Sequence, residues 1–232
     1  MSIIKNFPEP IIDYDIENIY SPAEDTYLIV DYFKNHIEHD FLDGIPIKKI
    51  RKILDMGTGT GYIALFFQIL KNNIPDFNPN IYASDILEEA ISLSKHNESL
   101  NKFNNEIEFI HSDLFANFPN NLKHSFDIIL FNPPYLPSFN SFQPKEKKKN
   151  IDNSWDGGSH GFELFTKFLD ETITYLKSEL DSRIYYICSS RTDLDKLYKI
   201  IKDKGFNNNK VLEKRHFFFE NIYLNRLKLS SV

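Results

Sequence analysis

The sequence predicts an α/β fold of the Rossmann-like type, with helices on both faces of a seven-stranded, mostly parallel sheet. Short apolar runs alternate with helix-like patterns along most of the chain. The first core run leads into a glycine-rich loop and a helix, as at the start of a Rossmann unit. Residues 211–229 are rich in β-forming residues around a turn near Glu220 and Asn221. This last pattern predicts a C-terminal antiparallel hairpin that completes the sheet.

Length and composition fit one domain of ordinary charge. The chain has 232 residues and a net charge of −6, so we expect a single domain over residues 1–232 without a wholly basic surface. Cys188 is the only cysteine, which excludes an internal disulfide and a multi-cysteine metal site, and we expect no bound metal. The sequence shows neither a signal-peptide pattern nor an apolar run of membrane-spanning length. We therefore expect a cytoplasmic protein that does not bind membranes.

The N-terminal part of the chain is predicted to precede the core as a segment and a helix. Residues 1–20 are expected to be extended, because two prolines oppose a helix there. A helix is predicted over residues 21–37, with Ser21 as its cap, a proline at the first helical position and Glu24 completing a capping box. A linker that contains a glycine and a proline then leads to the Rossmann-like core, residues 51–232.

The core contains five apolar runs of strand length before the hairpin. We assign these strands to residues 51–55, 81–85, 107–110, 126–131 and 184–188. Helical patterns follow at residues 62–67, 87–100, 162–177 and 192–204. Residues 136–160 form a long loop after the fourth core strand, and structureless loops of this length inside a domain are usually functional.

Glycines and an acid follow the first core strand. Asp55 precedes Gly57, Gly59 and Gly61, whose Gly-x-Gly-x-Gly spacing departs from the dinucleotide fingerprint. An acid at this place would repel a pyrophosphate and would suit a cation or an ammonium group. The glycines allow the backbone to approach a ligand closely.

Two further acids follow the next two strands. Asp85 stands where Rossmann-like proteins hold ribose hydroxyls, and Asp113 could accept the exocyclic amine of an adenine. A nucleoside with a positive, amino-acid-bearing tail and no phosphate fits all three acids, and S-adenosylmethionine is that molecule. The alternative is that the glycines form only a tight turn and the acids are solvated loop residues.

The fourth core strand ends in Asn132-Pro133-Pro134-Tyr135, which we call the clamp. The proline after Asn132 holds that residue extended, and neither proline has an N–H. The Asn132 carboxamide oxygen and the Pro133 carbonyl can each accept one N–H of a substrate NH2 group, while Tyr135 can stack on a planar acceptor. Such a site would act mainly by positioning the nitrogen against the methyl donor. The alternative is a proline-rich end to a strand.

Several motifs together resemble the HemK-type protein-(glutamine-N5) methyltransferases, which modify the glutamine of the Gly-Gly-Gln motif in class I peptide-chain release factors. The matching stretches are residues 21–26, residues 55–61, Asp85, the clamp and residues 155–158. The glycine loop marks only the superfamily, and Asn-Pro-Pro-Tyr is shared with N6-adenine methyltransferases. Residues 21–26 and 155–158 are the stretches that restrict the resemblance to the HemK type. It implies a class I S-adenosylmethionine-dependent methyltransferase fold with S-adenosylmethionine as cofactor.

The resemblance also implies roles for individual residues. The donor pocket would be lined by Asp25, Thr26, Asp55, Gly57, Gly59, Asp85, Asp113 and Asn132. The catalytic residues would be Asn132, Pro133 and Tyr135, and the substrate glutamine would contact Asn132, Pro133, Pro134 and Tyr135.

The partners implied by the resemblance are a protein substrate and an activator. By this resemblance the substrate would be a class I release factor. Only about twenty residues precede the predicted capping box, whereas bacterial members carry a separate helical domain there. The chain therefore resembles the short archaeal and eukaryotic branch, whose members are activated by a small zinc-binding subunit. We expect no stable nucleic-acid binding.

Other functions stay open on the residues alone. The clamp permits adenine N6 of DNA or RNA as acceptor, against which the negative net charge stands. A lysine side chain in another protein is a less favoured acceptor, because its ammonium group must first lose a proton and no dedicated base is evident near the clamp. A catalytically inactive scaffold is a further alternative, and the intact clamp and glycine loop oppose it.

Four other features carry weaker predictions. Residues 145–149 are expected to be a solvated charge run or, alternatively, an electrostatic contact with a release factor or the RNA near it. Trp155 is interpreted as a substrate-facing lid rather than as local packing. Residues 217–219, three phenylalanines, are expected to pack in the core rather than to form a partner surface. Cys188 is expected to be a small buried apolar residue.

Overall fold

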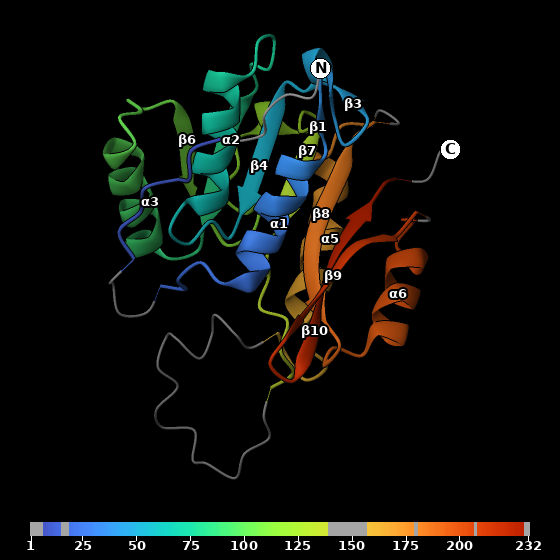
Figure 1. Cartoon of the computed structure of the whole chain (residues 1–232). Helices are drawn as coiled ribbons and strands as arrows, with labels where there is room; N and C mark the ends of the chain where they lie inside the picture. The colour runs from blue at the N-terminus through green and yellow to red at the C-terminus, as the bar shows by residue number, and fades with distance from the viewer. Residues whose placement is uncertain (1–6, 15–18, 139–156, 179–180, 207, 230–232) are drawn as a thin grey trace.

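A seven-stranded sheet forms the centre of the computed structural model, which describes residues 7–14, 19–138, 157–178, 181–206 and 208–229 (Figure 1). Its strands are β4 (Lys52–Met56), β5 (Asn80–Asp85), β6 (Ile107–His111), β7 (Ile128–Phe131), β8 (Arg183–Ser189), β9 (Lys210–Phe217) and β10 (Glu220–Leu227). They lie in the order β6-β5-β4-β7-β8-β10-β9. The first five are parallel, and β10 is antiparallel to β8 and to β9. The predicted mostly parallel sheet with a C-terminal hairpin is confirmed.

Helices cover both faces of this sheet. They are α1 (Glu24–Asn35), α2 (Tyr62–Asn73), α3 (Glu88–Leu100), α5 (Glu163–Tyr175) and α6 (Leu194–Asp203), with short 3-10 turns η1 (Ile47–Lys49) and η2 (Asn120–Leu122). Successive strand residues point to opposite faces, so Ile53 packs with α1 and α2 whereas Leu54 packs with α5 and α6. Cys188 is buried on the second of these faces, as predicted. Of the helices in the described ranges, none is long and apolar enough to cross a membrane.

The N-terminal helix begins later than predicted, and the capping box is wrong. Ala23 rather than Ser21 is the N-cap, in extended conformation and without a side-chain cap hydrogen bond, so Pro22 precedes the helix. The Glu24 carboxylate does not turn back toward Ser21, because it pairs with Arg215 of β9 at 3.2 Å. A tertiary ion pair therefore takes the side chain that the local cap would have used.

The predicted linker before the core is a small antiparallel sheet. Its strands are β1 (Ile37–Glu38), β2 (Phe41–Leu42) and β3 (Ile45–Pro46). Asp43, in the turn between β2 and β3, accepts hydrogen bonds from Tyr32 and Tyr185. It also pairs with Arg183 and Arg226, each at 2.7 Å. These partners come from α1, β8 and β10, so tertiary contacts order a segment that carries no long periodic pattern.

The β9–β10 turn differs from its prediction in place and in burial. The strands pair Phe217 with Glu220, so Phe218 and Phe219 form the turn, before the predicted position. Their side chains are 75% and 89% exposed, and the predicted core packing is wrong for both. The register explains this result, because it places both residues beyond the last paired position of the hairpin.

Candidate active site

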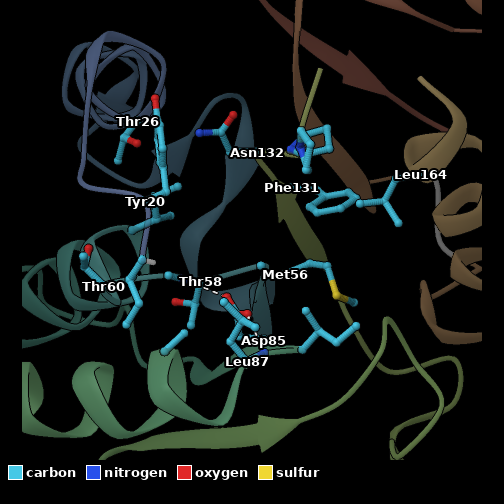
Figure 2. A pocket seen from close by; sticks show the side chains of 18 of the residues that line it. Tyr20, Thr26, Met56, Thr58, Thr60, Asp85, Leu87, Phe131, Asn132 and Leu164 are labelled. Carbon is cyan, nitrogen blue, oxygen red and sulfur yellow. Dashed lines mark hydrogen bonds between the residues drawn. The ribbon is translucent and has the colours of Figure 1, made fainter. Parts of the chain in front are cut away.

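The carboxyl ends of β4, β5 and β7, together with the start of α1, surround a cavity of about 460 Å³ (Figure 2). Strand order reverses between β4 and β7, and ligands of open α/β sheets bind at such a switch point. Met56 of β4 pairs with Phe131 of β7, so the loops after both strands leave the sheet side by side. The volume suits a ligand of nucleoside size or larger.

The glycine loop after β4 lies against its neighbours too closely for larger residues. Gly57 has φ 65°, and a Cβ there would lie 3.3 Å from the Phe131 ring. Gly61 has φ 84° and is the N-cap of α2, where a Cβ would lie 3.1 Å from Cβ of Ser94 on α3. The loop therefore packs tightly between β7 and α3 while its inner residues, including Gly59, line the cavity.

Asp55 turns its carboxylate into this loop and not into the cavity. It is 2% exposed and is absent from the residues that line the cavity in the described structure, whereas Thr58 lines it. The Asp55 carboxylate accepts hydrogen bonds from Thr58 Oγ1 at 2.6 Å and from the Ala64 N–H at 3.2 Å. Burial raises the pKa of Asp55 to about 7, despite the lowering effect of both hydrogen bonds. Asp55 thus shapes the loop that faces the ligand.

The two other predicted acids do line the cavity. Asp85 Oδ2 accepts the Gly59 N–H at 2.9 Å and Oδ1 accepts the Leu87 N–H at 3.0 Å, so this carboxylate joins the glycine loop to the end of β5. Burial raises the pKa of Asp85. Asp113 also lines the cavity, where its carboxylate pairs with Lys167 of α5 at 3.0 Å.

Asp25 joins the N-terminal helix to the clamp. It is 2% exposed and lines the cavity beside Thr26, whose backbone N–H it accepts at 2.7 Å. It also accepts the hydroxyl groups of Tyr20 and Tyr135, each at 3.0 Å. Burial and the Asp25 charge raise the pKa of both tyrosines, so both phenols stay protonated and donate.

The clamp occupies the end of β7, and all four of its residues line the cavity. Figure 2 shows the Asn132 side chain between the Thr26 and Phe131 side chains. Asn132 Oδ1 is buried and has no hydrogen-bond partner in the described parts of the chain. A buried acceptor without a donor costs about 1–3 kcal/mol, so this oxygen is suited to take an N–H from a ligand.

Glycines of the loop before α5 support the clamp from behind. A Cβ at Gly157 would lie 2.6 Å from the Pro134 carbonyl oxygen, and one at Gly161 would lie 2.5 Å from that of Tyr135. The Tyr135 carbonyl also accepts the Thr192 hydroxyl at 3.0 Å. The backbone of the clamp is thus fixed by close packing that only glycine permits.

The sequence did not reveal the apolar wall of the cavity. This wall consists of Met56, Ile86, Leu87, Leu114, Phe131 and Leu164. Such a surface suits the flat face of a base, and the apolar pair directly after Asp85 was the signal that could have indicated it. The predictions for Trp155 and for residues 145–149 lie outside the described residues.

Comparisons with known proteins agree with this geometry. Residues 39–142 match the protein family described as "Methyltransferase small domain". The chain is 32% identical over 188 residues to a protein of Methanocaldococcus jannaschii named as a protein N5-glutamine methyltransferase, covering 81% of each chain. It is 28% identical to the "eRF1 methyltransferase catalytic subunit mtq2" of Schizosaccharomyces pombe, over 87% of this chain and 85% of that protein.

The fold has solved counterparts among S-adenosylmethionine-dependent methyltransferases. The E. cuniculi Mtq2–Trm112 complex, described as responsible for methylation of the translation termination factor eRF1, matches with a TM-score of 0.61 at 20% identity. The match covers 92% of this chain and 99% of that one. Given the archaeal relative that is aligned over four-fifths of its length, the chain belongs to the protein N5-glutamine methyltransferases of the HemK type.

Proposed function

We propose that this enzyme transfers a methyl group from S-adenosylmethionine to the side-chain amide nitrogen of the glutamine in the Gly-Gly-Gln motif of a class I release factor. One observation carries the proposal: Asn132 Oδ1 is a buried acceptor without a partner in the described structure, at the edge of the cavity. A primary amide has two N–H groups, and the Pro133 carbonyl offers the second acceptor. Both contacts would hold the amide plane while its nitrogen faces the donor.

The cavity fits the donor. S-adenosylmethionine supplies an electrophilic methyl group on a sulfonium, so the protein needs no nucleophilic side chain. Its adenine would lie along the apolar wall, and Asp85, whose carboxylate already fixes the loop, would receive ribose hydroxyls. Gly57 and Gly59 line the cavity and have no side chain, so the amino-acid tail would lie close to their backbone. Asp113, Asp25 and Thr26 would complete the donor side.

The remaining groups of the clamp would act by orientation. Tyr135 is 9% exposed and its hydroxyl donates to Asp25, so its ring has a fixed position and would form one wall for the acceptor amide. Pro133 and Pro134 have no N–H to compete with the substrate. Positioning of this kind can supply a large part of a rate enhancement without acid–base chemistry.

The acceptor protein is argued from the relatives. The clamp alone accepts an amide or an adenine amine, but two relatives that align over most of this chain are named for N5-glutamine and eRF1 methylation. A small zinc-binding activator is proposed in the same way, because one solved neighbour is an Mtq2–Trm112 complex. The free edge of β6 within the described sheet is a place where such a subunit could add.

Radiolabelled methyl transfer tests the function. The purified protein, with and without a candidate activator, is incubated with labelled S-adenosylmethionine and a recombinant release factor. Label is expected on the wild-type factor and not on a factor whose Gly-Gly-Gln glutamine is changed to alanine. Equal labelling of that control would refute the site assignment, and label in nucleic acid alone would favour the adenine alternative.

A further inference from the structure

The β9–β10 turn carries the two most exposed large apolar side chains among the described residues. Phe218 and Phe219 are 75% and 89% exposed. The rings of Phe217 and Phe218 contact each other edge to face, with centroids 4.5 Å apart. A group of aromatic rings at a turn is apolar surface that gains free energy when a partner covers it.

The backbone of this turn is strained, because a phenylalanine occupies a position with a positive φ. Phe218 has φ 50°, a conformation that two-residue hairpin turns normally give to glycine or asparagine. A bulky residue is disfavoured there, because its Cβ crowds the backbone. A phenylalanine at such a position destabilises the turn. Strain of this kind is typical of binding segments.

The turn lies at the same edge of the sheet as the clamp. Ile222 of β10 pairs with Ser189, the last residue of β8, so the turn projects beyond the carboxyl end of β8 (Figure 1). The loop after β8 joins both sites: Ser190 N–H donates to the Asn221 carbonyl at 2.8 Å, and Thr192 donates to the Tyr135 carbonyl. Contacts therefore lead from the clamp to the base of the turn.

Ion pairs between β9 and α1 also fix the position of the hairpin relative to the cavity. Arg215 of β9 pairs with Glu24 at 3.2 Å and with Asp31 at 2.8 Å, both on α1. The same helix contributes Asp25 and Thr26 to the cavity. The two exposed rings thus have a set position with respect to the atom that would receive the acceptor amide.

We propose that Phe218 and Phe219 form a docking point for the protein that carries the acceptor glutamine, and that they insert into an apolar depression beside its Gly-Gly-Gln loop. The inference rests on the proposed function and adds to it the surface that selects the protein. A glutamine that reaches Asn132 belongs to a much larger body, which must lie over this edge of the sheet. Aromatic side chains are the common anchors of such interfaces.

The test replaces both rings by residues that favour the turn. The double variant Phe218→Gly, Phe219→Ser is expected to fold at least as stably as the wild type, because glycine adopts without strain the positive φ that residue 218 has and residue 219 has not. Its KM for the whole release factor should rise about tenfold or more, as expected for loss of an anchor. Its kcat, and its KM for a short Gly-Gly-Gln peptide, should stay at the wild-type values. Val211→Ser is the matched control, since Val211 is 43% exposed at the far end of β9.

The outcomes separate the docking inference from the function itself. An unchanged KM for the whole factor, with normal labelling of the peptide, would overturn the docking inference and leave the glutamine activity intact. If the wild type labels neither substrate, the proposed function fails and the inference falls with it. If KM is unchanged and only self-association or capture of an activator subunit is lost, the rings belong to another interface and the inference is overturned.

Discussion

Changing Asn132 to alanine should remove most turnover without weakening the fold. Asn132 Oδ1 is buried without a partner in the described structure, and burial of such an acceptor costs about 1–3 kcal/mol. The side chain borders an existing cavity, so its truncation enlarges that cavity and creates no new closed void. The free energy of unfolding is therefore expected to stay within about 1 kcal/mol of the wild-type value or to rise.

The expected loss of rate follows from the same oxygen. Removing one hydrogen-bonding group that positions reacting atoms typically lowers kcat by about 10²–10³-fold. Single-turnover methyl transfer measures this loss, calorimetry measures S-adenosylmethionine binding, and urea unfolding measures stability. Binding of the donor should weaken much less than turnover, because the donor side is built mainly by the glycine loop and Asp85.

A second buried asparagine supplies the contrast. Asn225 of β10 is 0% exposed, and its amide donates to Cys188 Sγ and to the Tyr223 carbonyl, both at 3.2 Å. Asn225→Ala should lower stability and leave kcat of the folded enzyme nearly unchanged. A role of Asn132 in holding the acceptor is refuted if Asn132→Ala loses more than about 2 kcal/mol of stability, a loss typical of a structural role, or if the variant retains wild-type turnover.

Three other changes test Asp85 on the donor side, the packing of Gly157 against the clamp, and the buried Asp55. Asp85→Ala should raise the Kd for S-adenosylmethionine more than it lowers kcat, measured by calorimetry and methyl transfer. If Asp85→Ala instead lowered kcat strongly and left donor binding nearly unchanged, as expected for Asn132→Ala, the division into donor and acceptor residues would be wrong. Gly157→Ala places a Cβ 2.6 Å from the Pro134 oxygen, and should lower kcat by about 10²-fold through displacement of the clamp; an active variant would show that the clamp tolerates the shift. Because burial holds the pKa of Asp55 at about 7 in the folded enzyme, above the unfolded value of about 3.9, the folded state binds the extra proton and the free energy of unfolding should fall as pH rises from about 4 to about 7. Urea unfolding across this range should show a flatter profile for Asp55→Asn, and a flat wild-type profile would contradict the shift.

The parallel core and the place of the clamp could be predicted, because both depend on local patterns. Apolar runs of strand length with turn residues at their ends define β4, β5 and β7. The two prolines after β7 also mark where that strand ends. Order within the sheet then brings the ends of these strands together. The predicted cavity-lining residues Asp85, Asp113 and Asn132 follow from that rule alone.

Other features depend on partners far away in the chain, and no local pattern reports them. Asp43 is ordered by Arg183 and Arg226, which lie 140 and 183 residues away. Asp25 was expected at the donor pocket only from the family resemblance, and nothing local indicated that it also holds Tyr135, 110 residues away. In each case a buried carboxylate collects donors from several elements, which requires the finished fold.

The register between β4 and β7 decides whether the two halves of the site can work together. Met56 lies beside Phe131, so Gly57 and Asn132 are the first residues beyond the paired positions of these two strands. Phe131 packs on the face of α5, and side chains alternate along a strand. A slip of one residue would bury Asn132 among the phenylalanines of that face and bring Pro133, which has no N–H and no amide side chain, to the cavity. Asp127, directly before β7, accepts the N–H groups of Arg51 and Lys52 at 2.7 and 3.0 Å, and a slip would break these bonds, so they hold the register that places the acceptor oxygen beside the glycine loop.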